Sequence, residues 1–194
     1  SVSNPLTGEI ISADVVNKLL AIKLGYNYRK LYGYTEDNDP LMQYITNLTL
    51  HEVGHVLGLR HNFRGSYLYS PDEIHDKNIT GNVLMSSVMD YDPINIAPEG
   101  VEQGIYFSTE PGVYDKWAVK FGYTPNLTEE ERTSLLQQSV KRELTFGTDD
   151  DAMSYPGNNI DPRTKRYDMS NDPIGYAEDI VKIVDQKINE LPEI

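Results

Sequence analysis

The sequence predicts an α/β (α+β) domain in which one well-defined helix is followed by a long irregular and helical half. Two observations favour this class: a short β-prone run lies near the N-terminus, and several later segments have helical periodicity or helix start signals. Residues 62–112 are rich in Gly, Pro, Asn and Asp and lack sustained periodicity, which predicts irregular structure. We expect one domain over residues 1–194, with residues 1–58 as its upper part and residues 59–194 as its lower lobe.

The first two elements are predicted to be a strand and a helix. Residues 11–15 alternate between apolar and polar side chains, as a half-buried strand requires. Residues 17–34 follow as a helix, although Gly25 and Gly33 weaken the pattern. The side chains that we expect on one side of this helix are Leu19, Ile22, Lys23 and Tyr26.

Residues 40–57 form the clearest predicted helix. Asp39 can cap its N-terminus and Pro40 suits its first position, whereas Gly58 can adopt the left-handed conformation that ends a helix. The side chains at steps of three and four along one face are Leu41, Ile45, Leu48, Glu52 and His55.

Three further helices are predicted in the lower lobe. Residues 112–123 form the first, and residues 126–140 form the second, with Thr128 and Glu131 as a capping box. Asp172 and Pro173 signal the start of the last helix. The expected buried edges are Trp117, Ala118 and Phe121 in the first helix, and Ile174, Ala177, Val181, Val184 and Ile188 in the last.

Composition excludes several classes of partner and site. The net charge of −13 opposes binding to nucleic acid phosphates, and no apolar run approaches the length of a membrane span. The absence of cysteine excludes disulfides and thiolate ligands, so a zinc site must use His, Asp or Glu. The densest acidic cluster, Asp149, Asp150 and Asp151, is interpreted as a solvated loop, with a calcium site as the alternative.

Residues 51–61, HEVGHVLGLRH, contain three of the four histidines. His51 and His55 are four residues apart on a helix, so their rings project from one face and can share a zinc ion. Gly58 lets the chain turn back, which brings His61 toward the metal as a third ligand. Three imidazoles leave one position open for water, and Glu52 is placed as its general base.

The pattern HExxH alone also occurs in helices that bind nothing, but here the glycine and the third histidine fall where a metal site needs them. A structural zinc is the alternative. It would normally close all four positions with protein ligands, and it would not need Glu52 beside the first ligand. His75, the fourth histidine, is interpreted as a surface residue.

HEVGHVLGLRH is similar to HExxHxxGxxH, the long zinc motif of the metzincin peptidases. That family implies a tight turn with a methionine beneath the metal, and SSVMDY at residues 86–91 makes Met89 this residue rather than a simple core methionine. The resemblance to the astacin and serralysin branches suggests that Tyr91 ligates zinc at rest and later stabilises the oxyanion. A packing role for Tyr91 is an equal alternative.

The segments NPLTGEIISADV, SVMDYDPINIAP, GVYDKWAVKFGY and DPRTKRYDMSNDPIGYAEDI resemble the Met-zincin domain of large secreted bacterial zinc-dependent metalloproteases. This resemblance implies a secreted, periplasmic or cell-surface location and a larger parent polypeptide. Metzincin domains usually begin with strands that would precede Ser1, so we expect those strands to be truncated here. By the same resemblance, GEIISADV is the candidate edge strand that pairs with substrate, and a strand without that role is the alternative.

These features predict a zinc metallopeptidase of the metzincin type, an endopeptidase that cleaves proteins or peptides. His51, His55 and His61 are the expected metal ligands, and Glu52 is expected to assist the attack of a zinc-bound water. Tyr91 is the second candidate catalytic residue. The alternatives are a zinc-bearing binding module without activity, a truncated fragment of a larger protease, and a zinc hydrolase that acts on a non-peptide amide or ester.

Overall fold

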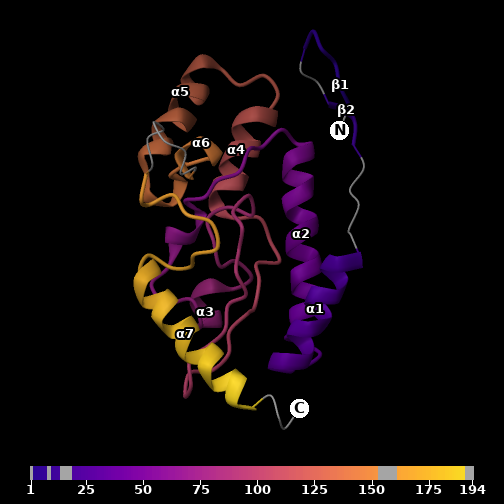
Figure 1. The fold of residues 1–194 in the computed structure, drawn as a ribbon. Coiled ribbons are helices and arrows are strands. Elements are labelled where there is room, and N and C mark those ends of the chain that lie inside the picture. The colour runs from indigo at the N-terminus through magenta and orange to yellow at the C-terminus, as the bar shows by residue number, and fades with distance from the viewer. Residues whose placement is uncertain (1, 8–9, 14–18, 153–160, 191–194) are drawn as a thin grey trace.

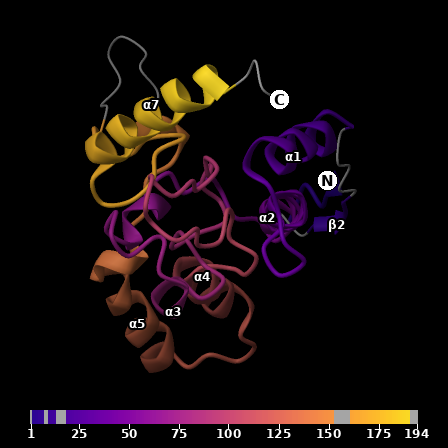
Figure 2. The same cartoon turned by 90° about the horizontal axis from the view of Figure 1, so that it is seen from below.

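The computed structural model describes residues 2–7, 10–13, 19–152 and 161–190. Helix α2 lies between two parts of the molecule in both views: α1 and a small hairpin lie on one side, and the rest of the described chain lies on the other (Figures 1 and 2). None of the helices in these ranges is long and apolar enough to cross a membrane. The described elements are β1 (Val2–Ser3), β2 (Ile10–Ser12), α1 (Leu19–Tyr32), α2 (Pro40–Val56), η1 (Gly65–Leu68), α3 (Lys77–Thr80), α4 (Val113–Tyr123), α5 (Glu129–Gln137), η2 (Gln138–Val140), η3 (Arg142–Leu144), α6 (Asp149–Ala152) and α7 (Pro173–Glu190).

Strands β1 and β2 pair antiparallel, with Val2 opposite Ser12 and Ser3 opposite Ile10. The predicted strand is therefore present at residues 10–12, and its end at residues 14 and 15 lies outside the described residues. The prediction that this strand is half-buried is wrong at Ile11, which is 65% exposed. The described sheet has only two strands, so Ile11 has no core against which to pack.

Helix α1 packs against α2 through Gly25, which is buried. A Cβ atom at Gly25 would lie 2.7 Å from Cδ1 of Leu41, so the two helices approach closely only because this side chain is absent. The predicted inward side of α1 is wrong at Ile22, Lys23 and Tyr26, which are exposed, and the side chain of Leu19 lies outside the described part of the chain. Instead, the side of α1 that bears Gly25 packs against α2.

The predicted boundaries of α2 are confirmed. The Asp39 side chain accepts a hydrogen bond of 3.0 Å from the Leu41 amide, and Pro40 is the first helical residue. Gly58 has a φ of +84°, the left-handed conformation that the sequence predicts just after the helix end.

The buried face of α2 is polar, whereas the sequence predicts a partly apolar stripe. Gln43, Asn47, His51 and Gly54 are buried, and the predicted stripe is only half-buried. The reason is that α2 covers irregular backbone, whose polar groups need partners. Oε1 of Gln43 accepts hydrogen bonds from two backbone amides, and Nδ2 of Asn47 donates to Asp92 at 3.1 Å.

The remaining helix predictions hold in part. Residues 62–112 are irregular as expected, apart from the short η1 and α3. The capping box of α5 is present, because the Glu131 amide donates to Thr128 and the Glu131 carboxylate accepts from the Thr128 amide. In α4 the predicted edge is only half-buried, and the fully buried side chain is Asp115.

Helix α7 begins at Pro173 as predicted, but its orientation differs from the expectation. Ile183 is buried, and Tyr176 packs against a core formed by Ile74, Leu84, Met85, Ile105 and Met169. The residues that the sequence places on the inward face are all exposed: Ile174, Ala177, Val181, Val184 and Ile188. The side of α7 that packs against the core is the one that bears Tyr176, the aromatic residue of this helix.

The contacts of Gln43 lead to a prediction about stability. In the wild type, Oε1 of Gln43 accepts hydrogen bonds from the buried amides of Tyr106 and Phe107 at 2.7 and 3.1 Å. In Gln43→Leu both amides lose this acceptor. We expect the free energy of unfolding to fall by about 2 kcal/mol or more, measured by urea denaturation. The same substitution at exposed Gln137 should change it little, and equal effects at the two positions would contradict this role.

Candidate metal centre

Three histidines converge at the C-terminal end of α2. His51 and His55 project from the helix, and the turn at Gly58 returns the chain so that His61 faces them. The ring centroids are 4.8 Å apart for His51 and His55, 4.8 Å for His55 and His61, and 5.4 Å for His51 and His61. One ligand atom from each residue lies within 4.8 Å of the others, and this is the only such group among the described residues.

The hydrogen bonds of His51 and His55 show which ring nitrogen of each is free to bind a metal. Nδ1 of His51 lies 2.7 Å from the Val88 carbonyl oxygen, and Nδ1 of His55 lies 3.0 Å from the Leu59 carbonyl oxygen. A carbonyl oxygen can only accept, so each Nδ1 atom has the hydrogen and each Nε2 atom has a free lone pair. Imidazoles held in this way by an outer partner are typical zinc ligands.

The third histidine is held by a carboxylate. Nδ1 of His61 lies 2.9 Å and 3.1 Å from the two oxygens of Asp149. Burial opposes the ionisation of Asp149, but the hydrogen bond and charge of His61 and the hydrogen bonds of its own turn together outweigh this effect and lower the pKa of the carboxyl group. Nε2 of His61 is therefore also free, and the three residues together fit the nitrogen donor set of a zinc site.

Burial also favours the form of His51 that can bind a metal. Only 6% of this residue is exposed, and this burial lowers the pKa of its imidazole. The side chain therefore stays neutral to a lower pH than a free histidine does. A neutral imidazole is the form that ligates a metal.

Met89 lies directly against α2 at Gly54, the residue before His55. Its side chain is fully buried, and a Cβ atom at Gly54 would overlap its sulfur atom. The Met89 amide donates to Ser87 at 3.1 Å, and the Met89 carbonyl accepts from the Asn62 amide at 3.0 Å. The first bond closes the predicted methionine turn on itself, and the second links the turn to Asn62, directly after the zinc motif.

Asp115 holds this turn in place, a role that the sequence analysis did not identify. Its carboxylate accepts hydrogen bonds from the Ser87 hydroxyl at 2.6 Å and from the amides of Val88 and Gly112 at 2.8 Å. Burial raises the pKa of Asp115, and these hydrogen bonds oppose the rise. The one available signal was its position three residues after Gly112, where an acidic side chain caps a helix start.

Tyr91 lies beside the histidines. Its ring centroid is 4.8 Å from that of His61 and 5.5 Å from that of His51. Burial raises the pKa of the phenol, with further contributions from Asp149 and Tyr167, so the hydroxyl keeps its proton and can donate. Tyr167 stacks on Tyr91 with a centroid distance of 5.7 Å and has a φ of +63°, a conformation that a bulky residue rarely adopts.

Glu52 is half-buried and directly follows His51 on α2. Burial dominates the pKa shifts of His51 and Tyr91, and the negative charge of Glu52 makes a smaller contribution that acts to raise both pKa values. Because Glu52 directly follows His51 on α2, it projects in the neighbouring direction of the helix, as the sequence predicts.

A downstream segment, residues 145–151, pairs with the end of the zinc motif. Nδ2 of Asn62 donates to the Thr145 carbonyl at 3.1 Å, and the Gly147 amide donates to Oδ1 of Asn62 at 3.1 Å. The Phe63 amide donates to the Gly147 carbonyl at 2.7 Å. These bonds bring the start of α6 next to the third histidine.

The acidic cluster at the start of α6 therefore has a different environment from the solvated loop expected from the sequence. Asp149 pairs with His61, Asp150 lies 3.4 Å from Arg60, and Asp151 accepts a hydrogen bond from the backbone of its own turn. The three carboxylates have separate partners, so the structure gives no support to the calcium alternative. The solvated interpretation is correct only for Asp150, which is exposed.

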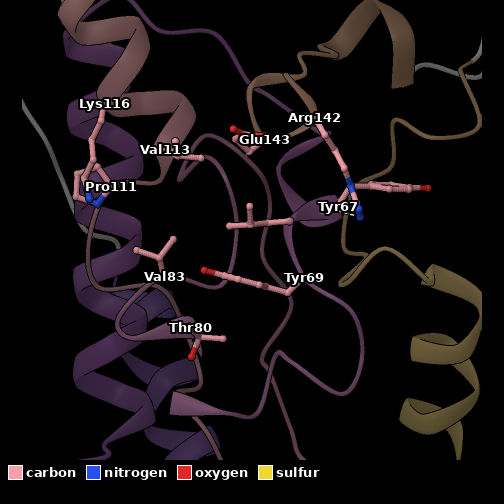
Figure 3. Close-up of a pocket in the computed structure, with 10 residues that line it drawn as sticks. Tyr67, Tyr69, Thr80, Val83, Pro111, Val113, Lys116, Arg142 and Glu143 are labelled. Carbon is pink, nitrogen blue, oxygen red and sulfur yellow. Dashed lines mark hydrogen bonds between the residues drawn. The ribbon is translucent and has the colours of Figure 1, made fainter. Parts of the chain in front are cut away.

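The fourth histidine and the pocket drawn in Figure 3 lie apart from this cluster. His75 is half-buried rather than on the surface, and burial lowers its pKa. The pocket has a volume of about 640 Å³ and receives side chains from η1, α3, α4 and η3, including Tyr67, Lys116 and Arg142 (Figure 3). None of the predicted site residues lines it.

Comparison with protein families identifies the chain. A family model described as Met-zincin matches residues 34–194. The chain belongs to the Met-zincin family. The matched range includes α2, the three histidines and the methionine turn, whereas β1, β2 and α1 precede it. No curated protein and no solved structure matches the chain significantly.

The contact between α2 and Met89 leads to a prediction about this Met-zincin site. In Gly54→Ala the new methyl group would overlap the Met89 sulfur, so the helix or the turn must shift. We expect a loss of about 1–3 kcal/mol in the free energy of unfolding, measured by urea denaturation, together with weaker zinc binding.

Gly122→Ala is the matched control, because nothing lies within 4 Å of a Cβ atom at this position in α4. We expect that variant to be unchanged or more stable by about 0.5–1 kcal/mol, owing to the helix propensity of alanine. A Gly54→Ala protein as stable as the control would show that the close approach is not required.

Proposed function

We propose that this Met-zincin domain is a zinc-dependent endopeptidase that hydrolyses peptide bonds in proteins or peptides. The observation that supports this most strongly is the convergence of three imidazoles, each with Nδ1 hydrogen-bonded, together with Glu52 on the helix that bears two of them. Membership of the Met-zincin family supports the same class of activity.

His51, His55 and His61 would hold the zinc ion through their Nε2 atoms. A bound zinc ion lowers the pKa of water to about 7 and polarises a carbonyl group. Among the described residues no fourth His, Asp or Glu joins the three histidines. This supports a site with a position for water and substrate, as in catalytic zinc sites, rather than a structural site closed by four protein ligands.

Glu52 supplies the proton transfers in this proposal. Its carboxylate accepts a proton from the water that attacks the scissile carbonyl, and then donates that proton to the leaving amine. Its half-buried position limits the solvent around the carboxylate, and it directly follows His51 on α2. A zinc-bearing binding module would have no need of a carboxylate at this position.

Tyr91 is the candidate donor to the oxyanion. Its hydroxyl stays protonated because burial raises the pKa of the phenol, and its ring lies beside those of His51 and His61. A donor placed where negative charge develops stabilises the transition state more than the bound substrate. We propose this role for Tyr91 in preference to zinc ligation, because it requires only the protonated hydroxyl.

The first prediction concerns the general base. Glu52→Gln removes the proton acceptor but none of the three histidines, so we expect it to bind zinc as the wild type does. Its turnover of a casein-like substrate should fall by about 10²–10⁴-fold, measured with the zinc-loaded proteins. Zinc content of both proteins is measured in parallel by elemental analysis.

Glu36→Gln is the control for that experiment, because Glu36 is exposed in the turn before α2. We expect it to leave turnover and zinc content unchanged. The proposed mechanism is wrong if zinc-loaded Glu52→Gln cleaves as fast as the wild type. The peptidase proposal itself fails if the zinc-loaded wild type cleaves no protein or peptide.

The second prediction concerns Tyr91. Tyr91→Phe keeps the ring that packs against His61 and removes only the hydroxyl. We expect kcat to fall by about 100-fold with little change in KM, in steady-state assays on a fluorogenic peptide. Tyr26→Phe on the exposed side of α1 should change neither constant, and an unchanged kcat in Tyr91→Phe would leave Tyr91 with a packing role only.

A further inference from the structure

The three histidines of the cluster differ in what holds their outer nitrogen. The partners of His51 and His55 are backbone carbonyls, whereas the partner of His61 is the carboxylate of Asp149, at 2.9 and 3.1 Å. Asp149 is 88 residues further along the chain and lies in the first turn of α6. The third ligand thus depends on a segment that is not part of the zinc motif.

His61 needs such a partner more than the other two histidines do. His51 and His55 lie on α2, and the helix limits the directions in which their rings point. His61 follows the turn at Gly58 and lies outside any helix. The ring of Phe63 stacks against one face of His61 at 5.0 Å, but stacking is equally good after a half-turn about the Cβ–Cγ bond of His61, which exchanges Nδ1 with Cδ2 and Nε2 with Cε1. A hydrogen bond at Nδ1 fixes that rotation.

The position of Asp149 is itself set by backbone contacts. The Phe63 amide donates to the Gly147 carbonyl at 2.7 Å, and the Gly147 amide donates to Oδ1 of Asn62. Gly147 is packed so closely that a Cβ atom there would lie 2.5 Å from Oγ1 of Thr164. These contacts hold residues 145–147 against residues 62 and 63, which leaves Asp149 little freedom to move away from His61.

We propose that Asp149 is a positioning residue for the metal: it keeps the hydrogen of His61 on Nδ1, directs Nε2 at the shared site, and so couples zinc affinity to the docking of residues 145–152. Outer partners of this kind typically contribute 10- to 100-fold to metal affinity. Because such coupling is reciprocal, bound zinc also stabilises the docked segment. The proposal rests on the metal site of the proposed function and is independent of peptidase activity.

The test measures zinc affinity by competition with a chromophoric chelator, in wild type, Asp149→Ala and the matched control Asp150→Ala. Asp150 is the adjacent residue, and its ion-pair partner among the described residues is exposed Arg60. We expect zinc to bind about 10- to 100-fold more weakly to Asp149→Ala and within about twofold of wild type to Asp150→Ala. Equal affinity of Asp149→Ala and wild type would overturn the proposal.

A second measurement separates positioning from general stability. Nitrogen-15 NMR of the zinc-free proteins reports which ring nitrogen of His61 has the hydrogen. We expect Nδ1–H in wild type and in Asp150→Ala, and a mixture of both tautomers in Asp149→Ala. A His61 that stays in the Nδ1–H form without Asp149 would contradict the proposed role.

Asp149→Leu keeps the approximate size of the side chain but has no acceptor, and it serves if the alanine variant does not fold. We expect its zinc affinity to fall in the same direction, because nothing then accepts from Nδ1 of His61. Unchanged affinity in this variant would also overturn the proposal. A wild type that binds zinc but cleaves nothing would contradict only the peptidase proposal, whereas equal zinc affinities would contradict only the role of Asp149.

Exchange of the Phe63 amide with solvent tests the reciprocal effect, since this amide donates to Gly147 in the docked segment. We expect zinc to slow its hydrogen exchange in wild type and to slow it less in Asp149→Ala. An exchange rate that zinc leaves unchanged in wild type would overturn the coupling.

Discussion

Helix α2 lies directly on Met89 because Gly54 has no side chain at the point of contact. This approach brings the turn around Met89 so close to the helix that the Val88 carbonyl reaches Nδ1 of His51. The turn is held from its other side by Asp115. A larger residue at Gly54 would push the turn away, and the hydrogen bond that directs His51 would be lost with it.

The second constraint is that irregular chain must satisfy its backbone polar groups once it is buried. Much of this task falls to side chains here. Gln43 accepts from the amides of Tyr106 and Phe107, and Asn62 bonds both Thr145 and Gly147. The same side chains that satisfy the backbone therefore also place the segments around the histidines. The packing of the irregular half and the arrangement of the site therefore depend on the same side chains.

The sequence predicted the features that depend on local chemistry. The cap at Asp39, the turn at Gly58 and the helical spacing of His51 and His55 need only neighbouring residues, and each is present. The faces that helices bury were predicted less well, because apolar periodicity does not show that α2 covers irregular backbone through Gln43. Nor does it show that Asp149 meets His61 across 88 positions, which only the folded chain reveals.

We propose that three imidazoles of this chain bind one zinc ion and leave a position open. X-ray absorption spectroscopy at the zinc edge of the loaded protein measures these ligands. We expect three imidazole nitrogens at about 2.0–2.1 Å and a further light atom from solvent. A protein that retains no zinc, or a spectrum with fewer than three imidazoles, would contradict it.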